Sequence, residues 1–140
     1  DLVRFETVLW AAIDDRLQRE SRVSLGTLNI MLVVDSTPDC RVFDIAQALA
    51  ITVGGTSQAV DRLEKSGLCI RKPHPTDRRS SIVELTPEAQ ALLATATPVF
   101  DAELERLLRV PLTKSDVGHL ADSLRALRRS ISDGAAAPQS

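Results

Sequence analysis

Polar side chains recur along residues 53–66 at the spacing of one helical face. Gly54, Gln58, Arg62 and Lys65 are separated by four, four and three residues, so a helix would place them together. Amide and guanidinium groups hydrogen-bond to base edges, and basic groups pair with phosphates. The N-terminal end of this face is small, which would let another backbone approach closely. The candidate nucleic-acid contacts of this segment are Thr52, Gly54, Gly55, Thr56, Ser57, Gln58, Arg62 and Lys65.

A basic loop follows, in which Asp77, Arg78 and Arg79 separate two strand-like runs. From Arg62 to Arg79 there are six basic and two acidic residues, which gives this stretch a charge of +4. The formal net charge of the whole chain is −2, so the remainder carries −6. Such segregation fits a DNA-facing edge on an acidic body, although a solvated basic loop would have the same composition. We add all three loop residues to the candidate contacts.

Other reactive side chains form no recognisable site. His74 and His119 lack the close spacing of metal ligands, so we expect no metal and no cofactor. No nucleophile–base pair, glycine-rich phosphate loop or paired carboxylate motif is present, so we expect no enzyme activity. Cys40 and Cys69 are most simply two unpaired thiols in a reducing compartment, and a redox role for either is left open.

The elements that must position these residues can be predicted from apolar periodicity and capping residues. Helices are expected over 2–20, 24–35, 42–50 and 53–66, the last stopped by Gly67. Strands are expected over 68–72 and 80–85, joined by a loop that Pro73 and Pro75 keep extended. Helix, turn, helix and then hairpin is the order of a winged helix-turn-helix, which places one helix in the major groove of DNA. The fold class is therefore mainly α (α+β).

Two long helices should follow the hairpin. Thr86-Pro87-Glu88 is a strong helix start, Pro98 must kink or interrupt this helix, and Pro111 ends it. Thr113 and Asp116 resemble a capping box for the last helix. By role, we divide the chain into N-terminal support and dimerisation helices (1–35), a winged module (36–86), C-terminal dimerisation helices (87–133) and a flexible tail (134–140).

The two ends of the chain carry apolar stripes that a winged module of this size could not cover. The last helix has a seam at spacings of three and four, and the first helix has an apolar face of its own. Trp10 lies off the centre of that face, as a partner-facing residue or the wall of a pocket. We expect a homodimer. Its predicted interface residues are Leu2, Phe5, Leu9, Val117, Leu120, Leu124, Leu127 and Ile131.

The middle of the chain resembles the MarR family of bacterial transcriptional regulators. The motifs are IAQALAIT for the first helix and turn, VDRLEKSGL for the end of the recognition helix, and DRRSSIVELT for the wing. The resemblance implies a homodimer on a pseudo-palindromic DNA site and a small-molecule pocket beside the winged module, with Trp10 as a candidate ligand contact. It also implies that Arg79 enters the minor groove and that Asp77 holds Arg79 in place.

The chain departs from the family pattern at four places. Ala50 stands where the turn often has glycine, Gly54-Gly55 replaces small polar residues, Gln58 stands where arginine is common, and Ala89 stands where glycine is common after the wing. Glutamine suits adenine and arginine suits guanine, so Gln58 indicates a different base preference. None of these departures removes the chemistry of DNA binding.

We therefore expect a DNA-binding transcriptional regulator, most simply a repressor, released by a small apolar or aromatic effector. No apolar run approaches the roughly 20 residues that span a membrane, and no signal peptide is visible, so a cytoplasmic location is expected. Two alternatives are a winged-helix assembly or dimerisation module without DNA binding, and the dimerisation module of a methyltransferase-like enzyme. The first would not need arginine at the wing tip, and the second would need a further nucleotide-binding domain.

Overall fold

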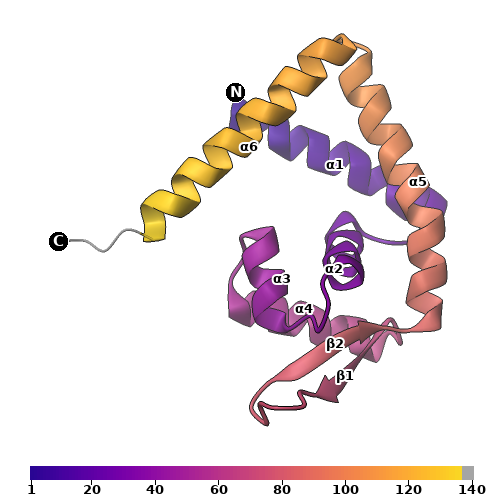
Figure 1. The fold of residues 1–140 in the computed structure, drawn as a ribbon. Helices are drawn as coiled ribbons and strands as arrows, with labels where there is room; N and C mark the ends of the chain where they lie inside the picture. The colour runs from indigo at the N-terminus through magenta and orange to yellow at the C-terminus, as the bar shows by residue number, and fades with distance from the viewer. Residues whose placement is uncertain (137–140) are drawn as a thin grey trace. The chain divides into compact units, whose positions relative to one another are not determined.

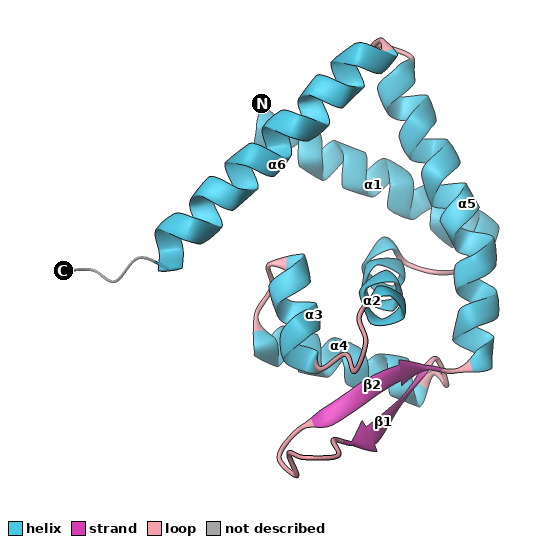
Figure 2. Cartoon of the chain, viewed as in Figure 1, coloured by secondary structure: helices cyan, strands magenta, loops and turns pink. Residues whose placement is uncertain are grey.

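The computed structural model describes residues 1–136, which form six helices and one antiparallel hairpin (Figures 1 and 2). This mainly helical winged fold confirms the predicted fold class. The elements are α1 (Leu2–Ser21), α2 (Leu25–Ser36), α3 (Val42–Leu49), α4 (Val53–Lys65), β1 (Cys69–Pro73), β2 (Ser81–Leu85), α5 (Pro87–Arg109) and α6 (Lys114–Ala136).

The chain divides into two compact units. Residues 1–102 form the first, which holds α1 to β2 and most of α5, and the second begins at Glu103 and contains the end of α5 and α6. The predicted division by role, into support helices, winged module and dimerisation helices, stays a prediction. Among the described residues, no helix is both long enough and apolar enough to cross a membrane.

The core of the first unit is built around α2, which is covered by its neighbours on several sides. Leu28 and Met31 of α2 are fully buried, and α1, α3, α4 and β2 each add a large buried side chain. Each contributes roughly 1.5–3 kcal/mol of burial free energy. The four added side chains are Leu17, Ile45, Val60 and Val83.

The helix-turn-helix, α3 and α4, is fixed by its turn and by the cap of α4. Ala50 ends α3 in the left-handed region at φ 54°, and the N–H of Ile51 donates to the carbonyl of Ala46 at 3.0 Å. Thr52 Oγ1 then accepts from the N–H of Gly55 at 3.1 Å, which caps the start of α4. Gly67 follows α4 at φ 73°, as predicted for its stop.

The hairpin is tied to the helix-turn-helix by its second strand. Cys69 pairs with Leu85 and Pro73 with Ser81 at its two ends. The N–H of Val83 donates to the carbonyl of Cys40, just before α3, at 2.7 Å. The hairpin therefore cannot move as a whole without disturbing the start of α3.

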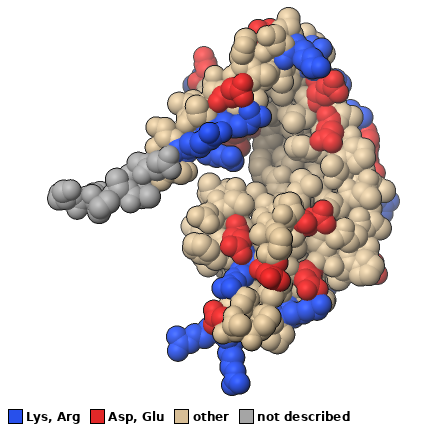
Figure 3. All heavy atoms as spheres, in the orientation of Figure 1, with Lys and Arg blue, Asp and Glu red and all other residues tan. Residues whose placement is uncertain are grey.

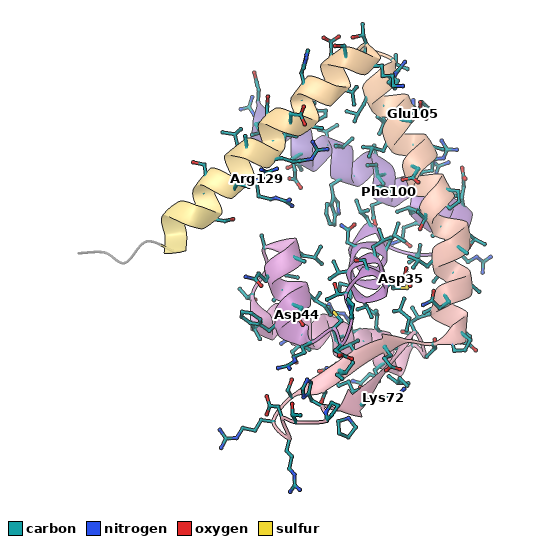
Figure 4. All side chains as sticks on the ribbon, in the orientation of Figure 1. Asp35, Asp44, Lys72, Phe100, Glu105 and Arg129 are labelled. Atoms are coloured by element: carbon teal, nitrogen blue, oxygen red, sulfur yellow. The ribbon has the colours of Figure 1, made fainter. Side chains whose placement is uncertain are left out.

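The fifth helix begins as predicted but is not interrupted. Thr86 Oγ1 accepts from the N–H of Ala89 at 3.2 Å, and Gln90 donates to Asp35 of α2 at 3.0 Å (Figure 4). Helix α5 continues through Pro98, so of the two predicted outcomes the interruption does not occur. Tertiary packing on the rest of the first unit can offset the hydrogen bond that proline cannot make.

The second unit contains the predicted capping box. The N–H of Thr113 donates to Asp116 at 3.0 Å, and the N–H of Asp116 donates to Thr113 Oγ1 at 3.2 Å. Hydrogen bonds from the Thr113 side chain and main chain lower the pKa of Asp116. Helix α6 then runs to Ala136, three residues into the predicted tail, and the rest of that tail, 137–140, lies outside the described residues.

Candidate nucleic-acid interface

Helix α4 has one buried face and one exposed face, as a recognition helix requires. Val60 and Leu63 are buried against the core, whereas Gly54, Gln58 and Lys65 are exposed. A cap at Thr52 and a stop at Gly67 fix where the helix begins and ends, so they also fix which side chains face outward. The outward stripe predicted for α4 is therefore present at Gly54, Gln58 and Lys65.

Thr56, predicted to contact DNA, is on the wrong face. Its side chain is 0% exposed, and its Oγ1 donates to the carbonyl of Thr52 at 2.8 Å. Thr56 precedes Val60 by four residues, so the two share the buried face. Its role is structural, and the spacing to Val60 was the signal in the sequence that could have placed it there.

A second flank of α4 lines a pocket instead of pointing straight outward. Gly55, Ala59 and Arg62, at helical spacings of four and three, face a cavity of about 640 Å³ that Trp10 of α1 also lines. Ala59 is only partly buried. Arg62 was expected on the same face as Gln58, and it lies at the border between that face and the pocket. Its side chain forms no ion pair with a described residue.

The two glycines of α4 differ in whether the structure has room for a side chain at their positions. A Cβ on Gly55 would meet Thr52 Oγ1 at 3.0 Å, so the helix cap itself disfavours a side chain there. A Cβ on Gly54 would meet nothing within 4 Å. The fold therefore does not require glycine at 54, and the open surface there is available to an outside partner.

Basic side chains project from the tip of the wing, the loop between β1 and β2 (Figure 3). Arg78 and Arg79 are exposed, and neither guanidinium forms an ion pair with a described residue. Asp77 does hold residue 79, but through the main chain, because the N–H of Arg79 donates to Asp77 Oδ1 at 3.0 Å. The Arg79 side chain stays free to enter a groove.

Two of the six basic residues counted in this stretch are already neutralised. Arg71 of β1 lies 2.7 Å from both Asp61 and Glu64 of α4, and Lys72 lies 2.6 Å from Glu84. Burial lowers the pKa of Arg71, but its hydrogen bonds to Asp61 and Glu64 outweigh burial and raise it. These pairs join the wing to α4. The unpaired basic groups are Arg62, Lys65, Arg78 and Arg79.

A further link between wing and helices was missed by sequence reasoning. Arg41, just before α3, has a guanidinium nitrogen 2.7 Å from His74 Nε2, and another nitrogen 3.9 Å from Asp77. His74 Nδ1 accepts from the N–H groups of Thr76 and Asp77, both at 3.2 Å. The main-chain N–H of Arg41 donates to the Asp44 carboxylate at 2.8 Å, which positions the main chain of Arg41 (Figure 4).

A groove of about 720 Å³ separates the wing from the first turns of α3 and α4. Serines and basic groups dominate its lining, and Phe43 and Val53 are its exposed large apolar residues. A strand of phosphate backbone that passes from the major groove, at α4, to the minor groove, at the wing, would have to cross this surface. The polar lining includes Arg41, Ser57, Arg71, His74, Arg79, Ser80 and Ser81.

The remaining reactive groups stay isolated. Cys40 and Cys69 are both buried. Burial raises the pKa of the Cys40 thiol to about 11 and also raises that of Cys69, which disfavours the reactive thiolate. Within the described part of the chain, no group of three His, Cys, Asp or Glu side chains could hold a metal.

The predicted interface residues are largely uncovered within the chain. On α1, Leu2 and Phe5 are exposed and Leu9 is partly exposed. On α6, Val117 and Leu120 are partly exposed, and exposure grows toward the C-terminal end. The exposed members on α6 are Leu124, Leu127 and Ile131.

Residues 23–81, which contain α2, the helix-turn-helix and most of the wing, match the model of the MarR family. In this central part the chain is similar to the MarR family. It is 27% identical over 109 residues to YfiV, an uncharacterised HTH-type transcriptional regulator of Bacillus subtilis, and this match covers 78% of the chain and 68% of YfiV. The MarR family consists of transcriptional regulators and not of enzymes.

Solved structures of MarR-type regulators have the same fold. The repressor CouR bound to a 23-mer DNA duplex superposes with a TM-score of 0.83 and 26% identity, over 91% of this chain and 89% of CouR. Sco3205 of Streptomyces coelicolor, also in complex with DNA, gives a TM-score of 0.84 at 24% identity, over 92% and 82%. CouR from Rhodococcus jostii has also been solved with p-coumaroyl-CoA, with a TM-score of 0.79, 20% identity, and coverage of 90% and 87%.

These comparisons favour a regulator over the two alternatives from the sequence. The relatives that match across most of the chain are DNA-binding regulators, whereas an assembly module or a methyltransferase part would match proteins of other classes. The individual DNA contacts, the dimer interface and the effector contacts stay predictions.

Proposed function

We propose that the protein is a homodimeric repressor that binds a pseudo-palindromic operator and is released from it by a small apolar or aromatic acid. The observation that carries the DNA-binding part is a set of exposed, unpaired donors on α4 and the wing, next to basic groups that are already neutralised. Gln58 would read bases, Lys65 and Arg78 would pair with phosphates, and Arg79 would enter the minor groove.

Selection of bound duplexes from a random library, followed by titration at several salt concentrations, tests this part. We expect two inverted half-sites about one helical turn apart, and a salt slope of several counterions. Recovery of unrelated sequences with equal affinity would contradict sequence-specific binding.

The dimer is proposed from the uncovered apolar residues of α1 and α6. Leu124, Leu127 and Ile131 recur at helical spacing on α6 and are exposed, as an obligate interface requires of the isolated chain. Burying each would contribute roughly 1.5–3 kcal/mol. Four or five such residues per subunit suffice for a stable pair.

Sedimentation at micromolar concentration tests the dimer. The wild type should sediment as a dimer, and Leu120→Asp with Leu124→Asp should give monomer or unfolded chain. Val110→Asp is the control, because Val110 is an exposed apolar residue that lies outside α6. A monomeric wild type would contradict the proposal.

The effector is proposed to bind in the cavity between α1, α2 and α4. Trp10 offers an aromatic face, Ile30 and Leu63 offer apolar contacts, and Arg62 offers a counter-charge for an acid group. An anion that draws Arg62 toward the pocket would remove it from the DNA-facing border of α4. This would lower operator affinity without unfolding the module.

Trp10 makes this part directly measurable, because it is the only tryptophan in the chain. We expect one or more phenolic acids to change its fluorescence, raise the melting temperature and weaken operator binding. Ala59→Leu, which fills part of the cavity, should abolish all three responses. A panel without any fluorescence or melting response would contradict an effector site here.

A further inference from the structure

Val53 is an exposed apolar residue at the leading end of α4. It is the first helical residue after the Thr52 cap, and its side chain is 50% exposed. Val53 continues the stripe of Thr56, Val60 and Leu63 to the first turn of α4, but unlike these three residues it is not buried. Alanine would be a better helix former at this position.

Val53 lies in a mixed groove, whose other apolar residues are Pro38, Val42 and Phe43, and Phe43 is 61% exposed. This groove lies between the wing and the helix-turn-helix, and its other side chains include Ser57, Arg71 and Arg79. A groove that met only phosphates would gain nothing from Val53. An apolar contact on the DNA would account for its position.

The location of Val53 restricts which apolar group it can meet. Helical side chains point back toward the N-terminus, so Val53 leads α4 into whatever its first turn enters. The N-terminal residues of a recognition helix contact base edges in the major groove. Among the groups presented there by the four base pairs, the C5-methyl of thymine is the apolar one.

Gln58, on the exposed face of the same helix, points to the same kind of base pair. Its amide suits adenine N6 and N7, and the partner of adenine presents the thymine methyl in the same groove. Gln58 lies five residues after Val53, which is about 7.5 Å along the helix axis. Residues five apart project about 140° apart around a helix, so the two side chains would contact different base pairs of one half-site.

We propose that Val53 is a specificity residue that packs on a thymine methyl group in the major groove of each half-site. The proposal rests on the proposed operator binding through α4. It adds an apolar contact to the polar contacts of Gln58, and it makes the preferred half-site rich in A·T pairs.

The test uses duplexes selected by the full-length protein, resynthesised with one thymine at a time replaced by deoxyuridine or 5-bromodeoxyuridine. Uracil lacks the methyl group, and bromine restores a group of similar size. For the wild type we expect one thymine per half-site at which uracil weakens binding roughly fourfold, the effect of one buried methyl group. The bromo analogue should bind like thymine.

Two variants decide whether Val53 makes this contact. Val53→Ala should bind the thymine and uracil duplexes equally at that position. Ile70→Ala is the matched control, because Ile70 is an exposed apolar residue of β1 that does not line the groove, and it should keep the wild-type discrimination.

The outcomes separate this proposal from the one that it rests on. Uracil without effect at every thymine of a selected operator would overturn the role of Val53, as would a uracil penalty that Val53→Ala leaves unchanged. Failure to select any duplex would instead overturn operator binding itself.

Discussion

The guanidinium of Arg41 lies 2.7 Å from Nε2 of His74, although the two residues are 33 positions apart in the chain. Arg41 stands at the start of the helix-turn-helix and His74 at the base of the wing loop. Because His74 also accepts from the N–H groups of Thr76 and Asp77, this one contact joins the loop carrying Arg78 and Arg79 to α3. It acts beside the ion pairs of Arg71 with Asp61 and Glu64, which join β1 to α4.

Loss of this contact should loosen the wing. We expect Arg41→Gln and His74→Gln each to weaken operator binding several-fold, and the double variant to be little worse than either single one, because the two act as a unit. Faster hydrogen exchange of the Thr76 and Asp77 amides should accompany the loss. If the losses of operator affinity in the two single variants added fully in the double variant, Arg41 would act on DNA directly. Arg22→Gln is the control for the loss of one positive charge.

The two arginines of the wing tip should differ in what they contribute. Arg79→Ala should weaken binding by about 1–3 kcal/mol, the scale of a good groove contact. Arg78→Ala should cost less and mainly reduce the salt slope. Lys72→Ala serves as the control, because Lys72 is already paired with Glu84. Filter binding at three salt concentrations measures all three, and equal affinity of wild type and Arg79→Ala would refute the assignment.

Gln58 and Thr56 are two residues apart on α4 and should respond in opposite ways. Gln58→Ala should relax the selected sequence at one base position and leave stability unchanged, because Gln58 is exposed. Thr56→Val should keep the sequence preference and lose about 1 kcal/mol of unfolding free energy, the value of its hydrogen bond to Thr52. Repeating the selection and a urea titration on both variants tests this. If Thr56→Val changed the selected DNA sequence, Thr56 would have to contact DNA, and the prediction would be wrong.

Ala50 carries a backbone conformation that suits glycine better. At φ 54° the steric clash of an alanine destabilises the folded chain by about 1–2 kcal/mol. Glycine would remove this clash, but its greater conformational freedom in the unfolded chain would offset part of the gain. We expect Ala50→Gly to raise the free energy of unfolding by about 0.5–1 kcal/mol without changing operator affinity. Urea denaturation measures the first quantity and a gel shift the second, and a destabilised variant would contradict the prediction.

Features that depend only on residues close together in the chain could be predicted from the sequence. The caps at Thr52 and Thr86, the stop at Gly67 and the Thr113–Asp116 box involve residues within one helical turn, so their signals lie side by side in the chain. The faces of α4 were predicted less well. Thr56 was predicted on the outward face, although its spacing of four residues from Val60 places it on the buried face.

Contacts between distant segments had no such signal. Arg41 with His74, and Arg71 with Asp61 and Glu64, join side chains whose neighbourhood is set by the packing of the hairpin on α3 and α4. The basic composition of residues 62–79 could not reveal that Arg71 and Lys72 are already paired. The pocket lined by Trp10 and Arg62 likewise depends on how α1 and α4 pack.

The central claim, that two copies of α4 and the wing read two half-sites of one operator, is tested most directly by the spacing of those half-sites. Five base pairs inserted between the half-sites of a selected operator turn one of them by about half a helical turn. Gel-shift titration of the parent and the lengthened duplex gives the two dissociation constants. We predict that affinity for the lengthened duplex falls to that of a single half-site, and an unchanged dissociation constant would contradict the account.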